Sequence, residues 1–226
     1  MSIILGGNKM KETIDNILNQ TYPFSAQAMP IPFNECEPNV SEATLKYHYE
    51  YLKLYVNDLN KLMEEHEGYK SWSLKKILTN YTQIPLDLED AFIENAGGIF
   101  NHEAIFSVLC KPLCKEIKGK LADDLVSSFG SIEEFKTEIK NAAMEVIGVG
   151  YTCLVIDENG ELAITNVDNQ ENPIMYGMKP IFMIDMWEHA YYLDVNIDRS
   201  KYIDTQFCII DWDKIGKLYE DYLKEM

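Results

Sequence analysis

The strongest constraint on the fold of this chain is a long stripe of apolar and aromatic side chains between Glu42 and Glu65. Its members recur at steps of three and four residues, the spacing of one helix face: Leu45, His48, Leu52, Tyr55, Leu59 and Leu62. Ser41 stands where a helix N-cap is expected. The pattern therefore predicts a long helix that carries one imidazole, His48, on its buried face.

A second long helical pattern carries another histidine on its buried face. It follows a shorter helical segment over residues 73–80 and ends near Pro112, because proline breaks a helix. Its apolar stripe consists of Phe92, Ala96, Ile99, His102, Ile105, Phe106 and Leu109. Two long helices joined by a short connection favour an antiparallel hairpin. We therefore expect His48 and His102 to face a common interior.

The segment before the hairpin has a different character. Residues 8–20 predict an amphipathic helix, and four prolines between Pro23 and Pro38 predict an irregular connector. The apolar positions of the expected helix are Met10, Ile14, Ile17 and Leu18. We divide the chain into an N-terminal extension (1–29), a helical hairpin domain (30–114) and an α+β domain (115–226).

The second half predicts a small antiparallel sheet flanked by helices. Ser131 is the expected N-cap of a helix over residues 132–146, which Gly148 and Gly150 end. Alternating apolar residues around a turn predict a β-hairpin, and a later apolar run predicts a third strand. The expected strands span 151–156, 162–167 and 181–185, and helices follow over 188–195 and 212–223. The expected fold class is α+β: a long helical hairpin, then an α+β domain with a three-stranded antiparallel sheet.

The third expected strand ends in a carboxylate, Asp185, and His189 follows four residues later. Taken alone, such a pair is better explained as a helix-capping aspartate and a core histidine. However, His48 and His102 also face the interior, and three imidazoles with one carboxylate form a three-nitrogen, one-oxygen metal site. The fourth histidine, His66, lies in an acidic run and is expected at the surface.

Several segments from about Pro30 to the C-terminus resemble the iron/manganese superoxide dismutase family. The most specific is Asp185-Met-Trp-Glu-His189-Ala-Tyr-Tyr192, which is similar to the metal-binding signature of that family. Two segments around the helical histidines are similar to those that carry its other ligands: Lys46-Tyr-His48-Tyr and Asn95-Ala-Gly-Gly-Ile-Phe-Asn101-His102. Three more fall in family order: Gly130-Ser-Ile-Glu-Glu-Phe135, Asn169-Gln170-Glu-Asn-Pro173 and Asp211-Trp212-Asp213.

The resemblance implies a ligand set and an activity. The implied ligands of one manganese or iron ion per subunit are His48, His102, Asp185 and His189. The implied reaction is one-electron redox: a metal that cycles between the +3 and +2 states oxidises one superoxide to oxygen and reduces a second to peroxide. The family fold, a helical hairpin followed by an α+β domain, agrees with the patterns above.

The resemblance also implies two catalytic residues, Tyr55 and Gln170. In the family, a glutamine that bonds the metal-bound solvent comes from one of two places in the chain. Here the second-helix place holds Gly98 and the later loop holds Gln170, which resembles the manganese-type pattern. Tyr55 comes one residue earlier than usual, and Leu52 stands one turn after His48, where the family usually has a histidine.

By the same resemblance, four residues surround the metal site or a subunit interface: Trp187, Glu188, Tyr192 and Arg199. The positions of Glu188 and Tyr192 imply contact with a second subunit, so we expect a homodimer or a dimer of dimers. Arg199 is a candidate for the anion entrance, where it would steer superoxide against an unfavourable overall charge.

Composition limits the partners and the location. The net charge is −17, with 37 acidic and 20 basic residues, so we expect no nucleic-acid partner and no membrane partner. The start of the chain does not resemble a signal peptide, and no apolar run reaches membrane-spanning length, so we expect a cytoplasmic protein. Five cysteines without a CxxC pair argue against a disulfide framework. Cys110 and Cys114 are expected to be small buried side chains.

Two other functions stay open beside a superoxide dismutase that uses manganese or iron. The first is a metal-binding relative with low activity and a structural or assembly role, favoured by the extra N-terminal helix and by a substrate funnel altered at Leu52, Tyr55 and Cys153. Tyr151 and Cys153 stand where tryptophans are usual in the family. The second is another metal oxidoreductase or hydrolase, which would need further ligands or a general base that the sequence does not offer.

Overall fold

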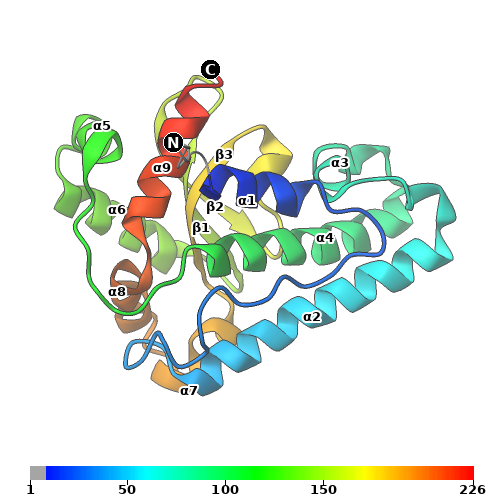
Figure 1. Ribbon diagram of the computed structural model, residues 1–226, viewed down its shortest axis with the longest axis horizontal. Coiled ribbons are helices and arrows are strands. Elements are labelled where there is room, and N and C mark those ends of the chain that lie inside the picture. The colour runs from blue at the N-terminus through cyan, green and yellow to red at the C-terminus, as the bar shows by residue number, and fades with distance from the viewer. Residues whose placement is uncertain (1–8) are drawn as a thin grey trace, which may run out of the picture.

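Figure 1 shows the computed structural model of the chain, in which residues 9–226 are described. The predictions that concern the helix start at residue 8 and the absence of a signal peptide fall on residues 1–8, outside the described part. Within residues 9–226, no helix combines the length and the apolar character of a membrane span.

Two long antiparallel helices form most of the first half (Figure 1). They are α2 (Glu42–Glu65) and α4 (Leu86–Ser107), and they pack against each other. The Ser41 hydroxyl accepts a hydrogen bond from Thr44 N at 3.1 Å, so the predicted N-cap of α2 is confirmed. His48 and His102 are both buried between these helices and the second half. The predicted hairpin is therefore confirmed.

Three short elements connect the long helices: η1 (Glu67–Tyr69), α3 (Leu74–Thr79) and η2 (Tyr81–Gln83). Ser73 caps α3 by accepting a hydrogen bond from Lys76 N. Helix α4 ends earlier than predicted, because after its C-cap, Val108, the chain pairs with the second half. Leu109 there forms an isolated antiparallel bridge with Ile210, which ties the end of the hairpin to the second half.

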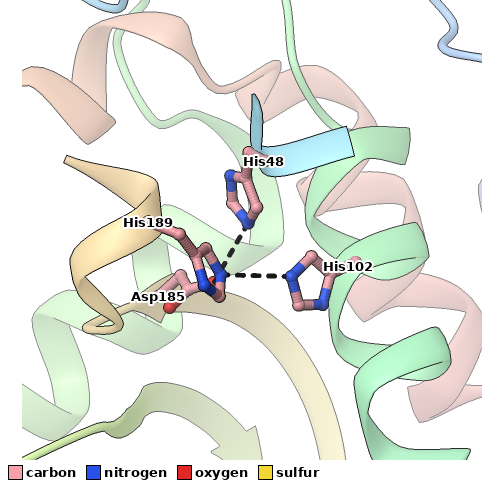
Figure 2. A group of neighbouring side chains, drawn as sticks. All are labelled: His48, His102, Asp185 and His189. Carbon is pink, nitrogen blue, oxygen red and sulfur yellow. Dashed lines mark hydrogen bonds and ion pairs between the residues drawn. The ribbon is translucent and has the colours of Figure 1, made fainter. Parts of the chain in front are cut away.

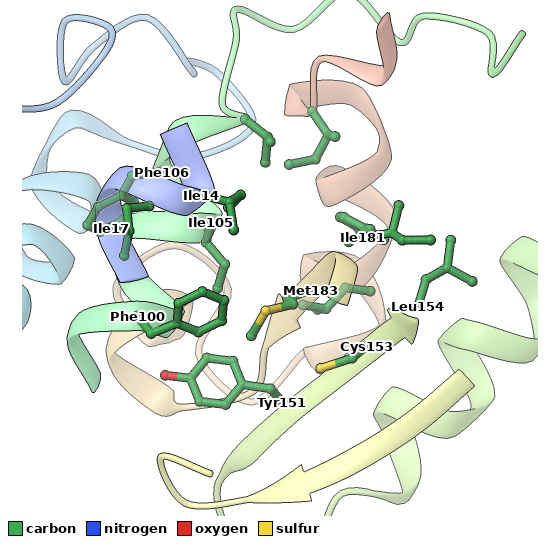
Figure 3. Packing of buried hydrophobic residues seen from close by; sticks show 14 of the residues in the cluster. Ile14, Ile17, Phe100, Ile105, Phe106, Tyr151, Cys153, Leu154, Ile181 and Met183 are labelled. Carbon is green, nitrogen blue, oxygen red and sulfur yellow. The ribbon is translucent and has the colours of Figure 1, made fainter. Parts of the chain in front are cut away.

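The N-terminal helix α1 (Lys9–Leu18) packs on α4 and on the last helix, α9 (Trp212–Leu223). Figure 3 shows Ile14 of α1 near Ile105 of α4, and both side chains are buried. The connector after α1 is held by Asn60, whose side-chain amide donates to Phe24 O at 2.9 Å and accepts from Phe24 N at 2.8 Å. The N-terminal extension is thus part of the hydrophobic core.

The second half contains a three-stranded sheet in the order β2-β1-β3. The strands are β1 (Gly150–Ile156), β2 (Leu162–Asp168) and β3 (Lys179–Asp185), and both neighbours run antiparallel to β1, which is buried along its whole length. The remaining elements are α5 (Gly119–Phe129), α6 (Ile132–Glu145), η3 (Pro173–Tyr176), η4 (Glu188–Ala190), α7 (Tyr192–Val195) and α8 (Arg199–Ile209). The α+β fold is confirmed, and the proposed domain boundaries stay a prediction.

Two helices of the second half were not expected from the sequence. Helix α5 follows Lys118, which forms no side-chain cap, so it lacks a start signal. Helix α8 has no continuous apolar stripe, because polar Gln206 is buried beside Tyr202 and Ile203. The helix predicted over residues 188–195 is divided into η4 and α7.

The expectation about cysteines is wrong. Cys114 and Cys208 form a disulfide between the segment that joins the two halves and helix α8. Cys114 is exposed and Cys110 is half-buried, so neither is the small buried side chain that was expected. The sequence spacing gave no signal for this pair, because 94 residues separate the two cysteines.

Reduction of this disulfide should lower stability. A bond that closes so long a loop restricts the unfolded chain, so its loss should decrease the free energy of unfolding by about 2–4 kcal/mol. Urea unfolding of the same preparation with and without a thiol reductant measures the difference. The double variant Cys114→Ser/Cys208→Ser should not respond to the reductant. A wild-type protein that is equally stable in both conditions would contradict the expectation.

Candidate metal centre

The carboxylate of the candidate centre lies at the end of β3. The strand residues before Asp185 are buried, and its backbone is paired with Tyr151 of β1. One carboxylate oxygen, Oδ1, accepts a hydrogen bond from Trp187 N at 2.7 Å. This bond fixes the carboxylate, so that its second oxygen, Oδ2, faces the interior between the two halves.

Three histidines converge on that oxygen from three different elements (Figure 2). His48 comes from α2, His102 from α4 and His189 from η4, and all three are buried. The Asp185 Oδ2 atom lies 3.1 Å from His48 Nε2 and 3.4 Å from His189 Nε2. One nitrogen from each imidazole and one Asp185 oxygen all lie within 4.8 Å of one another. The four residues predicted as ligands are therefore brought together.

The electrostatics of the group favour a charged Asp185 carboxylate beside neutral His48 and His102 imidazoles. Burial disfavours the charged form of Asp185, but the charge of His189 and the hydrogen bonds of His189 and His48 outweigh it and lower its pKa. Burial also lowers the pKa of His48 and, more strongly, that of His102. A neutral imidazole has a lone pair for a metal, so these shifts suit metal binding.

The orientation of His102 shows which nitrogen is available. Its Nδ1–H donates to Gly98 O, an acceptor only, at 2.7 Å, so Nε2 carries the lone pair. That Nε2 lies 3.3 Å from His189 Nε2. Imidazole nitrogens with lone pairs that face one another beside a carboxylate can bind a cation placed between them. Three nitrogens and one oxygen suit a first-row transition metal such as manganese or iron.

A buried side-chain amide lies next to this cluster. Gln170 Nε2 donates to Tyr55 Oη at 2.9 Å. Its Oε1 accepts from Tyr151 Oη at 2.8 Å and from Asn101 Nδ2 at 3.2 Å. Tyr55 in turn packs near His102, with ring centroids 5.3 Å apart, and burial raises the pKa of its phenol. Tyr55 and Gln170 are thus joined, although they are 115 residues apart in the chain.

Two adjacent glycines of α4 make room for this network. A Cβ atom on Gly97 would lie 1.8 Å from Gln170 O, and one on Gly98 would lie 2.5 Å from Tyr55 Cγ. Any larger residue would therefore displace either the Gln170 backbone or the Tyr55 ring. The need for glycine here comes from close approach, which the sequence alone did not reveal.

Two aromatic rings cover His189. Tyr51 stacks on its imidazole with ring centroids 4.2 Å apart, and Trp187 stacks on it at 5.6 Å. Tyr51 was missed by the sequence argument, which placed the altered entrance at Leu52. The Leu52 side chain is instead fully buried and lines a cavity together with Phe106.

Of the remaining predicted residues, Glu188 and Tyr192 lie at the surface and Arg199 is half-buried. Glu188 is exposed and Tyr192 is 45% exposed. Residues that contact a second subunit would be exposed in this way when one subunit is considered alone. The Arg199 guanidinium donates to Ala143 O and Val146 O at the end of α6. The proposed roles of these three residues stay predictions. His66 ends α2, is half-buried and takes no part in the cluster.

Comparison with known families finds two matches that divide the chain at the same place as the fold. The family model described as iron/manganese superoxide dismutases, alpha-hairpin domain, matches residues 23–110. The model described as iron/manganese superoxide dismutases, C-terminal domain, matches residues 117–218. Each match contains two of the four clustered residues, and helix α1 lies outside both.

The replacement Gly97→Ala should destabilise the protein. The added methyl group would collide with the backbone of Gln170, which cannot rotate away as a side chain could, so we expect a loss of about 1–3 kcal/mol in the free energy of unfolding. Gly68→Ala is the matched control, because a Cβ atom there would have no neighbour within 4 Å. Urea unfolding measures both variants, and equal stability of the two would show that the close approach carries no cost.

Proposed function

The chain belongs to the iron/manganese superoxide dismutases, and from this premise we propose that it converts two superoxide ions and two protons into oxygen and hydrogen peroxide. The observation that supports the proposal is the buried cluster of three histidines and one aspartate. The Gln170–Tyr55 pair beside the cluster also supports it. One metal ion per subunit would be held by His48, His102, Asp185 and His189.

The chemistry divides between the ion and the chain. A bound manganese or iron ion supplies one-electron oxidation and reduction. The cluster residues hold the ion, and Trp187 N fixes the carboxylate. Burial raises the pKa of Tyr55, so its phenol is protonated at neutral pH, and its ring packs beside His102. Gln170 holds the Tyr55 hydroxyl in place, so that the two residues form a positioned proton donor.

We propose manganese as the metal, with iron as the alternative. Gln170 occupies the later loop, as in the manganese-type pattern. A Cβ atom at position 98 would lie 2.5 Å from Tyr55 Cγ, so a glutamine on α4 would require the Tyr55 ring to move. Elemental analysis of the purified protein, followed by exchange of the bound metal and measurement of dismutation per ion, tests this choice.

Subunit assembly and location are also proposals. We propose a homodimer or a dimer of dimers joined at Glu188 and Tyr192. Sedimentation analysis tests it, and a monomer at all concentrations would contradict it. We propose a cytoplasmic location, although disulfides such as Cys114–Cys208 are more usual in oxidising compartments. Detection of the protein in separated fractions of the cells that produce it tests this location.

A second candidate function is a metal-binding protein with low dismutase activity and a structural or assembly role. The observation that favours it is the stack of the Tyr51 ring on His189, which covers one face of that ligand. Stoichiometric metal without dismutation in the wild-type protein would favour this second candidate.

The replacement His189→Ala should abolish both metal retention and dismutation. It removes one of four ligands. Loss of a residue that only supports a ligand typically lowers metal affinity by about tenfold to a hundredfold, so loss of a ligand itself should lower it by at least as much. His66→Ala is the matched control, because His66 lies outside the cluster. Metal content and superoxide consumption are measured on the same samples. Full activity of His189→Ala without bound metal would refute the proposed function.

The replacement Tyr51→His separates the two candidate functions. If the native site is an efficient dismutase, we expect at most a small change in activity per bound ion. A tenfold or greater increase would mean that the native entrance is poorly equipped and would favour the low-activity candidate. Leu52→His is the control: it buries an imidazole among apolar groups, so it should lower the free energy of unfolding by about 1–3 kcal/mol and leave the entrance unimproved.

A further inference from the structure

A cavity of about 420 Å³ lies behind the metal cluster, between α1, the connector, α2, α4 and α9. Its walls include the apolar side chains Met10, Ile17, Ala28, Pro30, Leu52 and Phe106. Figure 3 shows Ile17 of α1 and Phe106 of α4 on the same side of the core. A space of this size with mostly apolar walls is typical of sites for small molecules.

Two ionisable groups of opposite type line the same cavity: the Glu103 carboxyl, whose pKa burial raises to about 7, and the Lys214 ammonium. Glu103 is 97% buried, and its carboxylate oxygens accept hydrogen bonds from Gln20 Nε2 and Gln27 N, both at 2.8 Å. Lys214 is half-buried, and its Nζ donates to Ser107 O at 3.0 Å. Among residues 9–226, Glu103 and Lys214 form no ion pair within 4.0 Å, either with each other or with another side chain.

The placement of the two groups on one wall of the cavity limits the ligands that would satisfy both. Glu103 and Ser107 lie four residues apart on α4, so they face the same side one helical turn apart, and Ser107 O holds the Lys214 ammonium. Buried charges are costly unless they are paired. Each group keeps unused hydrogen-bonding capacity, because a carboxylate has several acceptor sites and an ammonium has three donors.

We propose that this cavity binds an α-amino acid with an apolar side chain. The ligand ammonium pairs with the Glu103 carboxylate, the ligand carboxylate pairs with Lys214, and the side chain fills the apolar remainder of the cavity. Helix α1 supplies one wall of the cavity and lies outside both family matches. The site is separate from the metal cluster, and its function does not depend on dismutation.

Calorimetric titration of the metal-loaded wild-type protein with three related probes tests the charge pairing. L-Phenylalanine carries both charged groups, 3-phenylpropionate lacks the ammonium, and 2-phenylethylamine lacks the carboxylate. We expect L-phenylalanine to bind at least about tenfold more tightly than either analogue, because each charged hydrogen bond contributes about one order of magnitude or more. Equal binding of one analogue, or no binding of any probe at millimolar concentration, would overturn the proposal.

Variants locate the binding in the cavity. Lys214→Met should weaken L-phenylalanine binding at least about tenfold, whereas Lys217→Met, an exposed lysine on the same helix that does not line the cavity, should not. Ala28→Phe places a ring at the exposed rim and should block entry without removing a core contact. Thermal unfolding of each variant confirms that it folds. Unchanged binding in Ala28→Phe and Lys214→Met would place any bound amino acid elsewhere and refute the site.

Discussion

The structure depends on one buried carboxylate, Asp185, and on the three imidazoles that face it. A charge removed from water is costly unless it is paired. The side chains that surround the Asp185 carboxylate come from both halves of the chain. His48 and His102 belong to the helical hairpin, whereas His189 follows Asp185 in the α+β half. The centre therefore also joins the two halves. Because a cation would bind the converging lone pairs only when both halves are in place, its binding free energy adds to the stability of the fold.

The hydrogen bonds around the cluster depend on how closely α4 approaches the Gln170 backbone and the Tyr55 ring. The carbonyl of Gly98 orients His102, while the missing side chains of Gly97 and Gly98 admit the Gln170 backbone and the Tyr55 ring. One short stretch of helix thus fixes a ligand tautomer and makes space for the hydrogen-bond network. This explains why an amide in this protein reaches the network from the loop after β2 and not from the helix.

The sequence predicted the elements whose signals are local and regular. The stripe that includes His48 has helical periodicity and a Ser41 cap, and the strand that ends at Asp185 is a short apolar run, so both were found within a few residues. Helix α8 was missed because its buried face includes the polar residue Gln206, so the sequence shows no regular apolar stripe there. The Cys114–Cys208 bond and the stack of Tyr51 on His189 join distant parts of the chain, and no local pattern encodes such contacts.

The departures from the family pattern differ in their physical consequences. Tyr151 stands where a tryptophan is usual, yet its hydroxyl donates to Gln170 Oε1, so the amide keeps a hydrogen-bond partner at both ends. Cys153 lies in the buried centre of β1, where a small side chain affects packing and has no contact with the cluster. Tyr51 is different, because it touches a ligand directly. Of these three residues, Tyr51 is therefore the one that can change how an anion approaches the centre.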